Sequence, residues 1–297
     1  LIFFILLFIA VLNRNNYDNY TQNKEINVSI SQLNFPIDFK PDKSKNTKKI
    51  EKIIRLIKEN RSDIIIFAEN NFPNIISNEK DLKFLQNDIE DNHFLIIGST
   101  SRYNKNFYNS FFLIDNTLIQ RFDKKILVPF GEFIPLRNYF SFMDFIVGTN
   151  DFSTGQQERK LQIKNNIKIL PVVCYEIMYF WRLMNQQNYD ANIIVNLTND
   201  KWFGDFSGPY QHFYFSKLRA AEFNKPLIRV SNNGISAVID NYGNILDYIS
   251  LNKRAIKKIK INNISPFQNY VTLHQYFIIF IFLFLIFCFL LNKKYDS

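Results

Sequence analysis

The residue with the clearest chemical potential is Cys174, which follows the apolar run 167–173 and precedes Glu176 by two positions. Cys288 is the only other cysteine among the 297 residues, and it lies inside a long apolar run near the C-terminus. We therefore expect neither a disulfide partner for Cys174 nor a second thiol that would complete a metal site. A lone cysteine at a strand end, beside acidic residues, is a candidate nucleophile.

Two further polar residues follow predicted strands. Glu69 comes after the buried strand 64–67, and Lys124 comes after the strand 118–122. Strand ends of α/β sheets collect catalytic groups because the rigid strand fixes the position of the side chain. A carboxylate can take the thiol proton as general base, and an ammonium can stabilise the oxyanion of a tetrahedral intermediate. Together the three residue types predict acyl transfer through a thioester.

Each of these residues also has a non-catalytic interpretation. A cysteine at a strand end is more often inert core packing, and a glutamate after a strand usually caps a helix or is solvated. A lysine in a pair such as Lys124-Lys125 is usually on the surface. The case for a site therefore depends on all three occurring together, and on the sequence around them.

The elements that must hold these residues alternate between strands and helices. In the segment 47–60, apolar residues recur at positions i, i+3, i+4 and i+7, which predicts an amphipathic helix. Residues 125–160 carry few regular signals. We expect one α/β domain in which helices cover buried sheets. Further strands are predicted at 25–33, 94–97, 110–114, 167–173, 193–197, 227–230, 235–239 and 245–249, and further helices at 81–91, 176–187 and 209–223.

Both ends of the chain are apolar. Residues 276–291 are uninterrupted apolar sequence, and the stretch 271–291 would reach roughly 30 Å as a helix, which is enough to span a bilayer. Two lysines after this predicted transmembrane helix favour a cytoplasmic C-terminus. Residues 1–12 are interpreted as the end of a longer membrane helix, so that the chain is expected to be a fragment. Residues 20–268 would then form one extracytoplasmic domain.

Charge and histidine spacing bear on partners and cofactors. The formal net charge of +9 comes from scattered lysines, without a basic run interleaved with aromatics, so we expect no nucleic-acid partner. His93 and His274 have no metal-ligand spacing, and no glycine-rich phosphate loop occurs, so no metal or cofactor is expected. A serine triad using His212 with Ser207 or Ser231 is disfavoured, because neither serine lies in a nucleophile-elbow pattern. His212 is interpreted as a structural histidine at the start of a helix.

Six segments near the candidate residues form an ordered set between about residues 26 and 250. They are LVPFGEFIP at 127–135, CYEI at 174–177, NDKWFG at 199–204, GPYQHF at 208–213, RAAE at 219–222 and SNNG at 231–234. In this order they closely resemble the nitrilase-type domain of the bacterial apolipoprotein N-acyltransferase family. The apolar flanks agree with that resemblance.

The resemblance implies the αββα sandwich of the carbon–nitrogen hydrolases and assigns roles to individual residues. Glu69 corresponds to the general base, Lys124 to the oxyanion-stabilising lysine and Cys174 to the nucleophile. Residues that the family needs in and around the site match Glu132, Tyr175 and Glu176. No cofactor is implied.

The reaction implied by the resemblance moves an acyl chain from a phospholipid donor to Cys174. The chain then passes to the α-amine of the S-diacylglyceryl-cysteine at the N-terminus of an apolipoprotein. The expected location is the bacterial inner membrane, with the catalytic domain on the periplasmic side.

The sequence departs from the family pattern at two places. The family usually has Trp-Pro before the catalytic glutamate, whereas Phe67-Ala68 stands here. A tryptophan common after the first strand is absent, with Phe39-Lys40-Pro41 near that place. These differences concern an early substrate-contact loop and leave the three catalytic candidates in place.

Two aromatic loops are candidates for a lid that enters the bilayer and admits an acyl chain. The first loop contains Phe140, Phe142 and Phe145, and the second contains Trp202 and Phe203. Buried loop packing is the alternative interpretation of both.

Two other functions remain open at this point. A membrane-anchored hydrolase of amides or nitriles would use the same glutamate, lysine and cysteine with water as second nucleophile, although the apolar flanks and loops speak against it. A non-catalytic lipoprotein-binding module is the third class, but a degenerate copy should have lost one of these three residues, and all are present.

Overall fold

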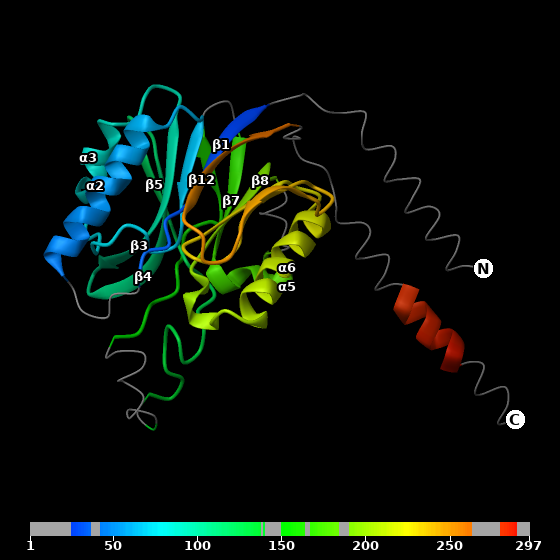
Figure 1. The fold of residues 1–297 in the computed structure, drawn as a ribbon. Coiled ribbons are helices and arrows are strands. Elements are labelled where there is room, and N and C mark those ends of the chain that lie inside the picture. The colour runs from blue at the N-terminus through cyan, green and yellow to red at the C-terminus, as the bar shows by residue number, and fades with distance from the viewer. Residues whose placement is uncertain are drawn as a thin grey trace, which may run out of the picture.

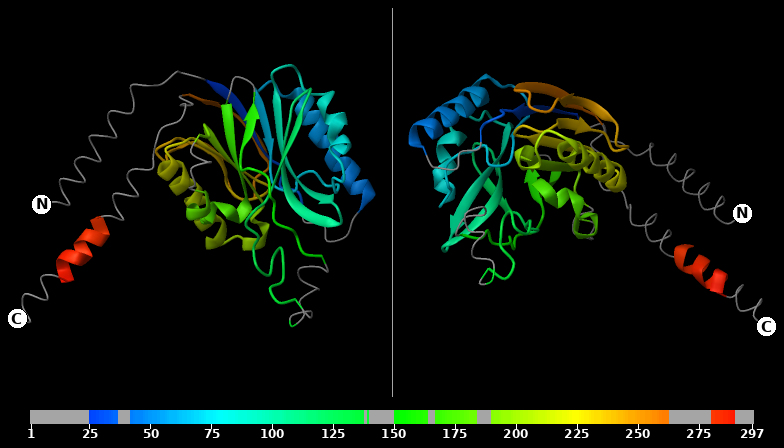
Figure 2. Two further views of the ribbon diagram at one scale, coloured as in Figure 1. Left: turned by 180° about the vertical axis from the view of Figure 1, so that it is seen from behind. Right: turned by 60° about the horizontal axis from the view of Figure 1, so that its bottom comes forward.

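A computed structural model of the chain describes residues 25–36, 42–137, 139, 150–163, 167–183, 190–262 and 280–289. Within these ranges the strands form two six-stranded sheets that pack face to face (Figures 1 and 2). Helices cover the outer side of each sheet. The four-layered αββα arrangement expected from the sequence is therefore confirmed.

The first sheet has a parallel centre and antiparallel edges. Strands β1, β2 and β3 run parallel, β4 and β5 continue as antiparallel hairpins, and β12 returns to pair antiparallel with β1. In spatial order the strands are β12 (Ala255–Ile261), β1 (Ile26–Gln32), β2 (Ile64–Phe67), β3 (Phe94–Tyr103), β4 (Asn106–Ile114) and β5 (Ile119–Asp123).

The second sheet follows the same plan. Strands β7, β8 and β9 are parallel, while β6, β10 and β11 join them antiparallel. In spatial order the strands are β11 (Ile245–Ile249), β10 (Ser236–Ile239), β9 (Leu227–Ser231), β8 (Ile193–Thr198), β7 (Ile167–Val173) and β6 (Leu161–Ile163). In both sheets the parallel strands therefore lie at the centre and the antiparallel strands at the edges.

Helices α2 (Lys43–Glu59) and α3 (Lys83–Gln86) lie on the first sheet, and α5 (Phe180–Leu183) and α6 (Ser207–Phe223) lie on the second. The side chain of Asp42 caps α2 by accepting from the backbone N–H groups of Ser44 and Lys45. The described residues also include a helix at 280–289 and three short 3₁₀ turns: η2 (Glu79–Leu82), η5 (Cys174–Met178) and η7 (Asp200–Phe203).

The apolar runs in central strands such as β2 and β7 have a direct structural cause, because both faces of these strands are buried. In β7, Ile169 and Val173 enter the core between the sheets, whereas Leu170 and Val172 pack under α5 and α6. The same alternation holds in β2, where Ile66 faces the other sheet. A strand with no solvent-exposed face reads as an unbroken apolar run.

Two predicted helices are shorter than expected. The helix predicted at 81–91 contains only η2 and α3, because the following residues include Asn87, Asp88 and Asn92, which have low helix propensity. The helix predicted at 176–187 begins as the 3₁₀ turn η5, and its α-helical part in the described residues is α5. Strands β6 and β12 were not expected, since β6 is very short and β12 is an edge strand rich in lysine.

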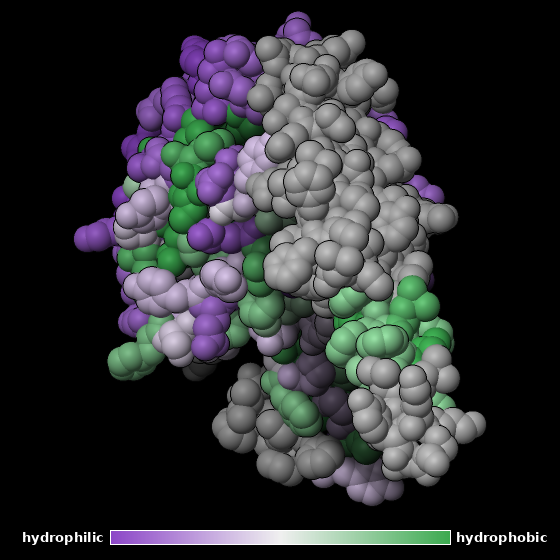
Figure 3. Space-filling model, turned by 90° about the vertical axis from the view of Figure 1, so that its right-hand side faces the viewer, coloured by the Kyte–Doolittle hydropathy of each residue, from purple (hydrophilic) through white to green (hydrophobic). Residues whose placement is uncertain are grey.

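The predicted membrane segments fall largely outside the described residues. Residues 1–12 lie outside them, and of the predicted span 271–291 only residues 280–289 are described, as a helix with exposed apolar side chains. Figure 3 shows hydrophobic residues gathered on the lower part of the face that it presents. None of the helices within the described ranges combines the length and apolar content that a bilayer span requires. The loop residues Phe140, Phe142 and Phe145 also lie outside the described residues.

Candidate active site

The three residues singled out at strand ends come together between the two sheets. Glu69 follows β2 and Lys124 follows β5 in the first sheet, while Cys174 follows β7 in the second. All three side chains are buried, with exposed fractions of 6%, 1% and 8%. Glu69, Lys124 and Cys174 are close enough for each of the three to interact electrostatically with the other two. The Cys174 thiol is also within hydrogen-bonding reach of the Glu69 carboxylate. The site is thus built from both sheets.

Cys174 occupies a left-handed backbone conformation with φ of +51°. Such a conformation is unfavourable for a residue with a side chain and persists only where the surroundings enforce it. It lies where β7 ends and η5 begins, so the chain turns sharply at the nucleophile candidate. The Thr198 hydroxyl lies 3.4 Å from the Cys174 Sγ. The thiol is therefore held at a fixed place on the end of the second sheet.

Asn109 joins the two carboxylates of the site. Its Nδ2 donates to Glu69 Oε1 at 2.7 Å and to Glu132 Oε1 at 2.9 Å. Glu132 Oε2 in turn forms a 2.7 Å ion pair with Lys124 Nζ and accepts from the Val128 N–H at 3.0 Å. This chain of contacts fixes Glu69, Glu132 and Lys124 relative to one another. Asn109, in the interior of β4, was not anticipated from the sequence.

The charges of the site divide between groups that stay neutral and groups that stay ionised. Burial, with the Glu69 carboxylate nearby, raises the pKa of the Cys174 thiol. Burial also raises the pKa of Glu69, and the Glu132 carboxylate adds to that effect against the opposing Lys124 ammonium. For Lys124 burial alone would lower the pKa, but Glu132 and the other nearby acidic groups outweigh it and raise the pKa. A protonated thiol therefore faces a carboxylate of raised proton affinity and a charged lysine.

Glu176, expected near the site, links the segment after Lys124 to the strand before Cys174. Its Oε1 accepts from the N–H groups of Lys125 and Ile126 at 2.8 and 3.1 Å, and its Oε2 accepts from the Val173 N–H at 2.9 Å. Arg159 adds a bidentate contact of 2.6 and 2.7 Å to the same carboxylate. Burial opposes ionisation, but Arg159 outweighs it and holds the pKa of Glu176 below its usual range.

A second buried network lies behind Cys174 and was missed as a group by sequence reasoning. Asp200 accepts from Arg229 Nη2 at 2.7 and 3.0 Å and from the Thr198 hydroxyl at 2.9 Å. The Nδ1 of His212 lies 2.8 Å from Asp200 Oδ1, and its Nε2 lies 3.2 Å from the carbonyl oxygen of Cys174. His212, interpreted from the sequence as a structural histidine, therefore lies buried in α6 and contacts the backbone of the candidate nucleophile.

The network explains why several of the quoted motifs lie together. Asp200 belongs to NDKWFG, His212 to GPYQHF and Gly234 to SNNG. A Cβ atom at Gly234 would lie only 1.8 Å from Asp200 Oδ2, so that only glycine leaves room for this carboxylate. Sequence order alone does not reveal that these three segments meet behind one cysteine.

The aromatic residues expected at the site differ in exposure. Tyr175 packs against Phe203 and His212, with ring centroids 6.1 and 5.9 Å apart. Phe203 is partly buried, whereas Trp202 next to it is 66% exposed and Phe206 is 88% exposed. In the second predicted lid segment the ring of Phe203 therefore packs inward, whereas the rings of Trp202 and Phe206 are exposed.

Within the described ranges, no group of histidine, cysteine, aspartate and glutamate side chains is placed to hold a metal ion. The cluster of Cys174, Glu69, Glu132 and Lys124 combines a thiol, two carboxylates and an ammonium group. This set can transfer a proton and stabilise an oxyanion.

The sequence of this chain is similar to a known protein family and to individual curated proteins. A family model described as "Carbon-nitrogen hydrolase" matches residues 27–267. The curated protein "Apolipoprotein N-acyltransferase" of Rhizobium rhizogenes is 35% identical over 206 residues, covering 65% of this chain and 38% of its own length. The protein of the same name from Rickettsia prowazekii is 36% identical over 219 residues, covering 71% of this chain and 42% of its own length. The chain thus spans less than half the length of these two relatives.

Solved structures share the fold at low sequence identity. A CN-hydrolase superfamily protein from Xanthomonas campestris matches with a TM-score of 0.59 and 15% identity, covering 80% of this chain and 91% of that protein. A carbon–nitrogen hydrolase from Helicobacter pylori matches with a TM-score of 0.58 and 15% identity, covering 80% and 89%. The αββα sandwich is therefore common to these proteins and to the present chain.

Proposed function

The chain belongs to the carbon–nitrogen hydrolase family, and on that basis we propose that it transfers a fatty acyl chain from a phospholipid to the N-terminal amine of a diacylated apolipoprotein. The observation that carries the proposal is the buried cluster of Cys174, Glu69 and Lys124 in a chain whose curated relatives bear the name apolipoprotein N-acyltransferase. The exposed aromatics beside Tyr175 support a lipid substrate, since a soluble amide would require no such surface.

In the proposed first step, Cys174 Sγ attacks the ester carbonyl of the phospholipid while the thiol proton passes to Glu69. Lys124 stabilises the oxyanion of the tetrahedral intermediate, an interaction worth roughly 3 kcal/mol for one donor. Collapse of the intermediate breaks the ester bond, and the lysophospholipid alkoxide leaves with the proton from Glu69. The acyl chain remains on Cys174 as a thioester.

In the proposed second step, the α-amine of the diacylated N-terminal cysteine attacks the thioester. Glu69 accepts the amine proton, and Lys124 again stabilises the oxyanion. The new amide forms as the Cys174–acyl bond breaks, and the proton on Glu69 returns to sulfur. Glu132 and Glu176 act as positioning residues in this scheme, because their carboxylates are already held by Lys124 and Arg159.

The proposal also assigns a location. Residues 271–291 and 1–12 would lie in the bacterial inner membrane, and residues 20–268 would form the periplasmic catalytic domain. The apolar, exposed helix at 280–289 supports a membrane segment in this region.

The test uses the full chain in detergent micelles with a phospholipid whose acyl chains are isotopically labelled. The acceptor is a synthetic S-diacylglyceryl-cysteinyl peptide with a free N-terminus, and the control is the same peptide with an acetylated N-terminus. We expect the free peptide alone to gain the mass of one labelled acyl chain as lysophospholipid appears. Labelled free fatty acid without acylated peptide would show that water is the second nucleophile, and the proposed transfer would be wrong.

A further inference from the structure

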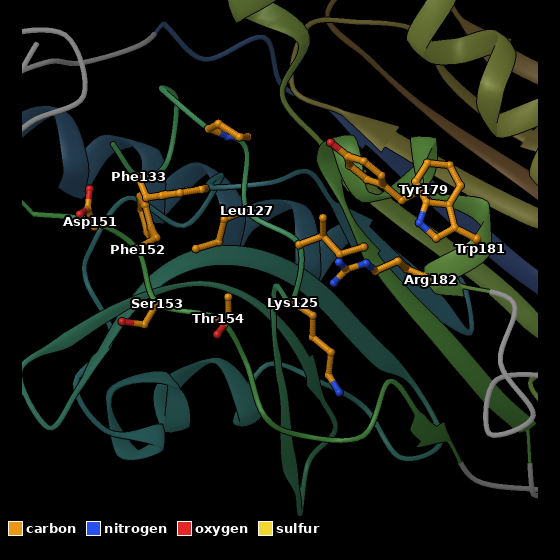
Figure 4. Close-up of a pocket in the computed structure, with 12 residues that line it drawn as sticks. Lys125, Leu127, Phe133, Asp151, Phe152, Ser153, Thr154, Tyr179, Trp181 and Arg182 are labelled. Atoms are coloured by element: carbon orange, nitrogen blue, oxygen red, sulfur yellow. The ribbon is translucent and has the colours of Figure 1, made fainter. Parts of the chain in front are cut away.

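A pocket of about 660 Å³ is lined by residues that neighbour the candidate active-site residues in the sequence. Its volume is within the range of pockets that bind small molecules. One wall is the segment after Lys124, including Leu127 and Phe133, and the opposite wall is the region of α5, including Tyr179 and Arg182. Figure 4 shows the side chain of Arg182 reaching from this second wall toward the first.

The pocket is connected to the catalytic residues through their sequence neighbours. Lys125 follows Lys124, and its N–H is bound by Glu176. Phe133 follows Glu132, which pairs with Lys124. On the other wall the ring of Tyr179 lies 5.9 Å from that of Tyr175, the residue after Cys174. The two walls therefore belong to the chain segments that carry Lys124, Glu132 and Cys174.

The lining combines apolar surface with positive charge. Leu127, Phe133 and Phe152 gather on one side of Figure 4, while Trp181 lies on the other. Among the described lining residues Asp151 is the one carboxylate, and it is ion-paired with Arg137.

Two cations of the lining have no such partner. Neither Lys125 nor Arg182 forms an ion pair with another residue in the described part of the chain. Burial and the neighbouring Arg159 guanidinium lower the pKa of Lys125, and together they outweigh the opposing carboxylates of Glu176 and Glu158. The hydroxyl groups of Ser153 and Thr154 add hydrogen-bond donors to the same lining.

We propose that this pocket binds the phosphodiester of the acyl-donor glycerophospholipid, with Arg182 and Lys125 on the phosphate and the apolar wall against the glycerol and the first part of an acyl chain. A guanidinium and an ammonium are the side chains that proteins use for phosphate oxygens. The assignment rests on the proposed function and adds to it the recognition of the donor through its phosphate. It distinguishes a phospholipid from an uncharged lipid ester with the same acyl chains.

The test compares two acyl donors in neutral detergent micelles, phosphatidylglycerol and diacylglycerol with identical chains. The initial rate at which Cys174 gains an acyl group is followed by intact mass at several mole fractions of each donor. For the wild-type chain we expect phosphatidylglycerol to react faster than diacylglycerol at low mole fraction. Replacing either cation, as Arg182→Gln or Lys125→Gln, should lower this rate ratio about tenfold, because each substitution removes one charge-assisted hydrogen bond to the phosphate. The loss should appear in the donor concentration needed for half-maximal rate.

Two further variants serve as controls for the loss of charge. Lys48→Gln removes an exposed charge from α2 on the outer side of the first sheet and should keep the wild-type ratio. Arg182→Lys retains the charge and should restore part of the ratio lost in Arg182→Gln. An unchanged ratio of the two donor rates in both glutamine variants would overturn the inference. An effect confined to acyl transfer onto the lipopeptide would also overturn it, because the pocket would then bind the acceptor. Absence of any lipid adduct on the wild type, with Cys174 still acylated by a soluble p-nitrophenyl ester, would instead overturn the proposed function.

Discussion

At the scale of single residues, the proposed chemistry depends on a thiol that stays protonated until a carboxylate removes its proton. Burial and Glu69 raise the pKa of Cys174, so the thiolate does not form in the resting site. Glu69 is suited to act as base, because burial raises its pKa and brings its proton affinity closer to that of the thiol. Lys124 remains charged and faces both groups.

A pH prediction follows from the raised pKa of Glu69. The carboxylate is the active form, so the rate of Cys174 acylation should fall as the pH drops through the raised pKa. We expect the midpoint of this acid limb above the ordinary glutamate value of about 4.3. Initial acylation rates with a soluble p-nitrophenyl ester measure it without lipid effects. An acid limb at or below the ordinary value would contradict the assignment of Glu69 as base.

The sequence predicts the residues at strand ends better than the residues that support them. Glu69, Lys124 and Cys174 share a recognisable position, at or just beyond the end of a strand. Asn109 lies in the interior of a strand, and Arg159 lies in a segment with few regular signals, so neither has a local pattern that indicates a site. Their roles arise from contacts between segments that are distant in the sequence.

At the scale of elements, close backbone packing between β2 and β3 positions Glu69. A Cβ atom at Gly98 in β3 would lie 2.7 Å from the Glu69 Cα and 2.9 Å from the Asn70 nitrogen. Both contacts are backbone atoms, which cannot move without shifting the carboxylate. Behind Cys174, α6 supplies His212 and β9 supplies Arg229, so that a helix and a strand together support the turn that carries the thiol.

Gly98→Ala should therefore reduce the acylation rate by about a hundredfold, because a displacement of about 1 Å in a catalytic group has effects of this size. The control is Gly131→Ala, whose Cβ would have an ordinary 3.4 Å contact with the Val128 side chain, also close to the site. Single-turnover acylation of both variants, with circular dichroism as a check of folding, makes the comparison. Equal rates in the two variants would show that the β2–β3 packing does not position Glu69.

Asp200→Asn should destabilise the domain, because it leaves the buried Arg229 guanidinium without its counter-charge. Loss of one partner from a buried ion pair costs about 3–5 kcal/mol. The control Asp205→Asn changes an exposed residue of the same segment, and we expect an effect within about 0.5 kcal/mol. Thermal unfolding in detergent provides the measurement. Similar melting temperatures for the two variants would mean that the network does not stabilise the fold.

The strands that are buried on both faces are the elements that the sequence predicts best. Their mainly apolar sequences identify β2, β7 and β8, with a single lysine near the start of β7 and polar residues only toward the end of β8. The edge strand β12 alternates lysine with apolar residues and gives a weaker signal, although it closes the first sheet by pairing with β1. Helix length after Cys174 was overestimated, because Glu176 bonds to backbone groups on two segments and tightens the first turn into a 3₁₀ conformation.

At the scale of the whole molecule, the two sheets supply different parts of the site. Glu69 and Lys124 belong to the first sheet and Cys174 to the second, so the chemistry requires the core between the sheets to hold them in register. Exposed aromatics, Trp202 and Phe206, lie on the segment that also contributes Phe203 to the packing of Tyr175. This places an apolar surface on the same side of the domain as the site.

If that surface contacts the bilayer, replacing both rings as Trp202→Ser and Phe206→Ser should lower the rate from phospholipid vesicles about tenfold relative to the rate with a soluble ester. Loss of one buried aromatic contact already accounts for an effect of this size. Tyr248→Ser, at an exposed ring on β11, is the matched control. An unchanged ratio of the two rates in the double variant would exclude this part of the lid hypothesis.

The most direct test of the central claim is the intact mass of the full chain after incubation with a defined phospholipid and no acceptor peptide. The proposed mechanism predicts a gain equal to one fatty acyl group on the wild type, removed by hydroxylamine as a thioester would be, and no gain on Cys174→Ala. A wild-type chain without the adduct, or an equal adduct on Cys174→Ala, would contradict the claim that Cys174 carries the acyl chain.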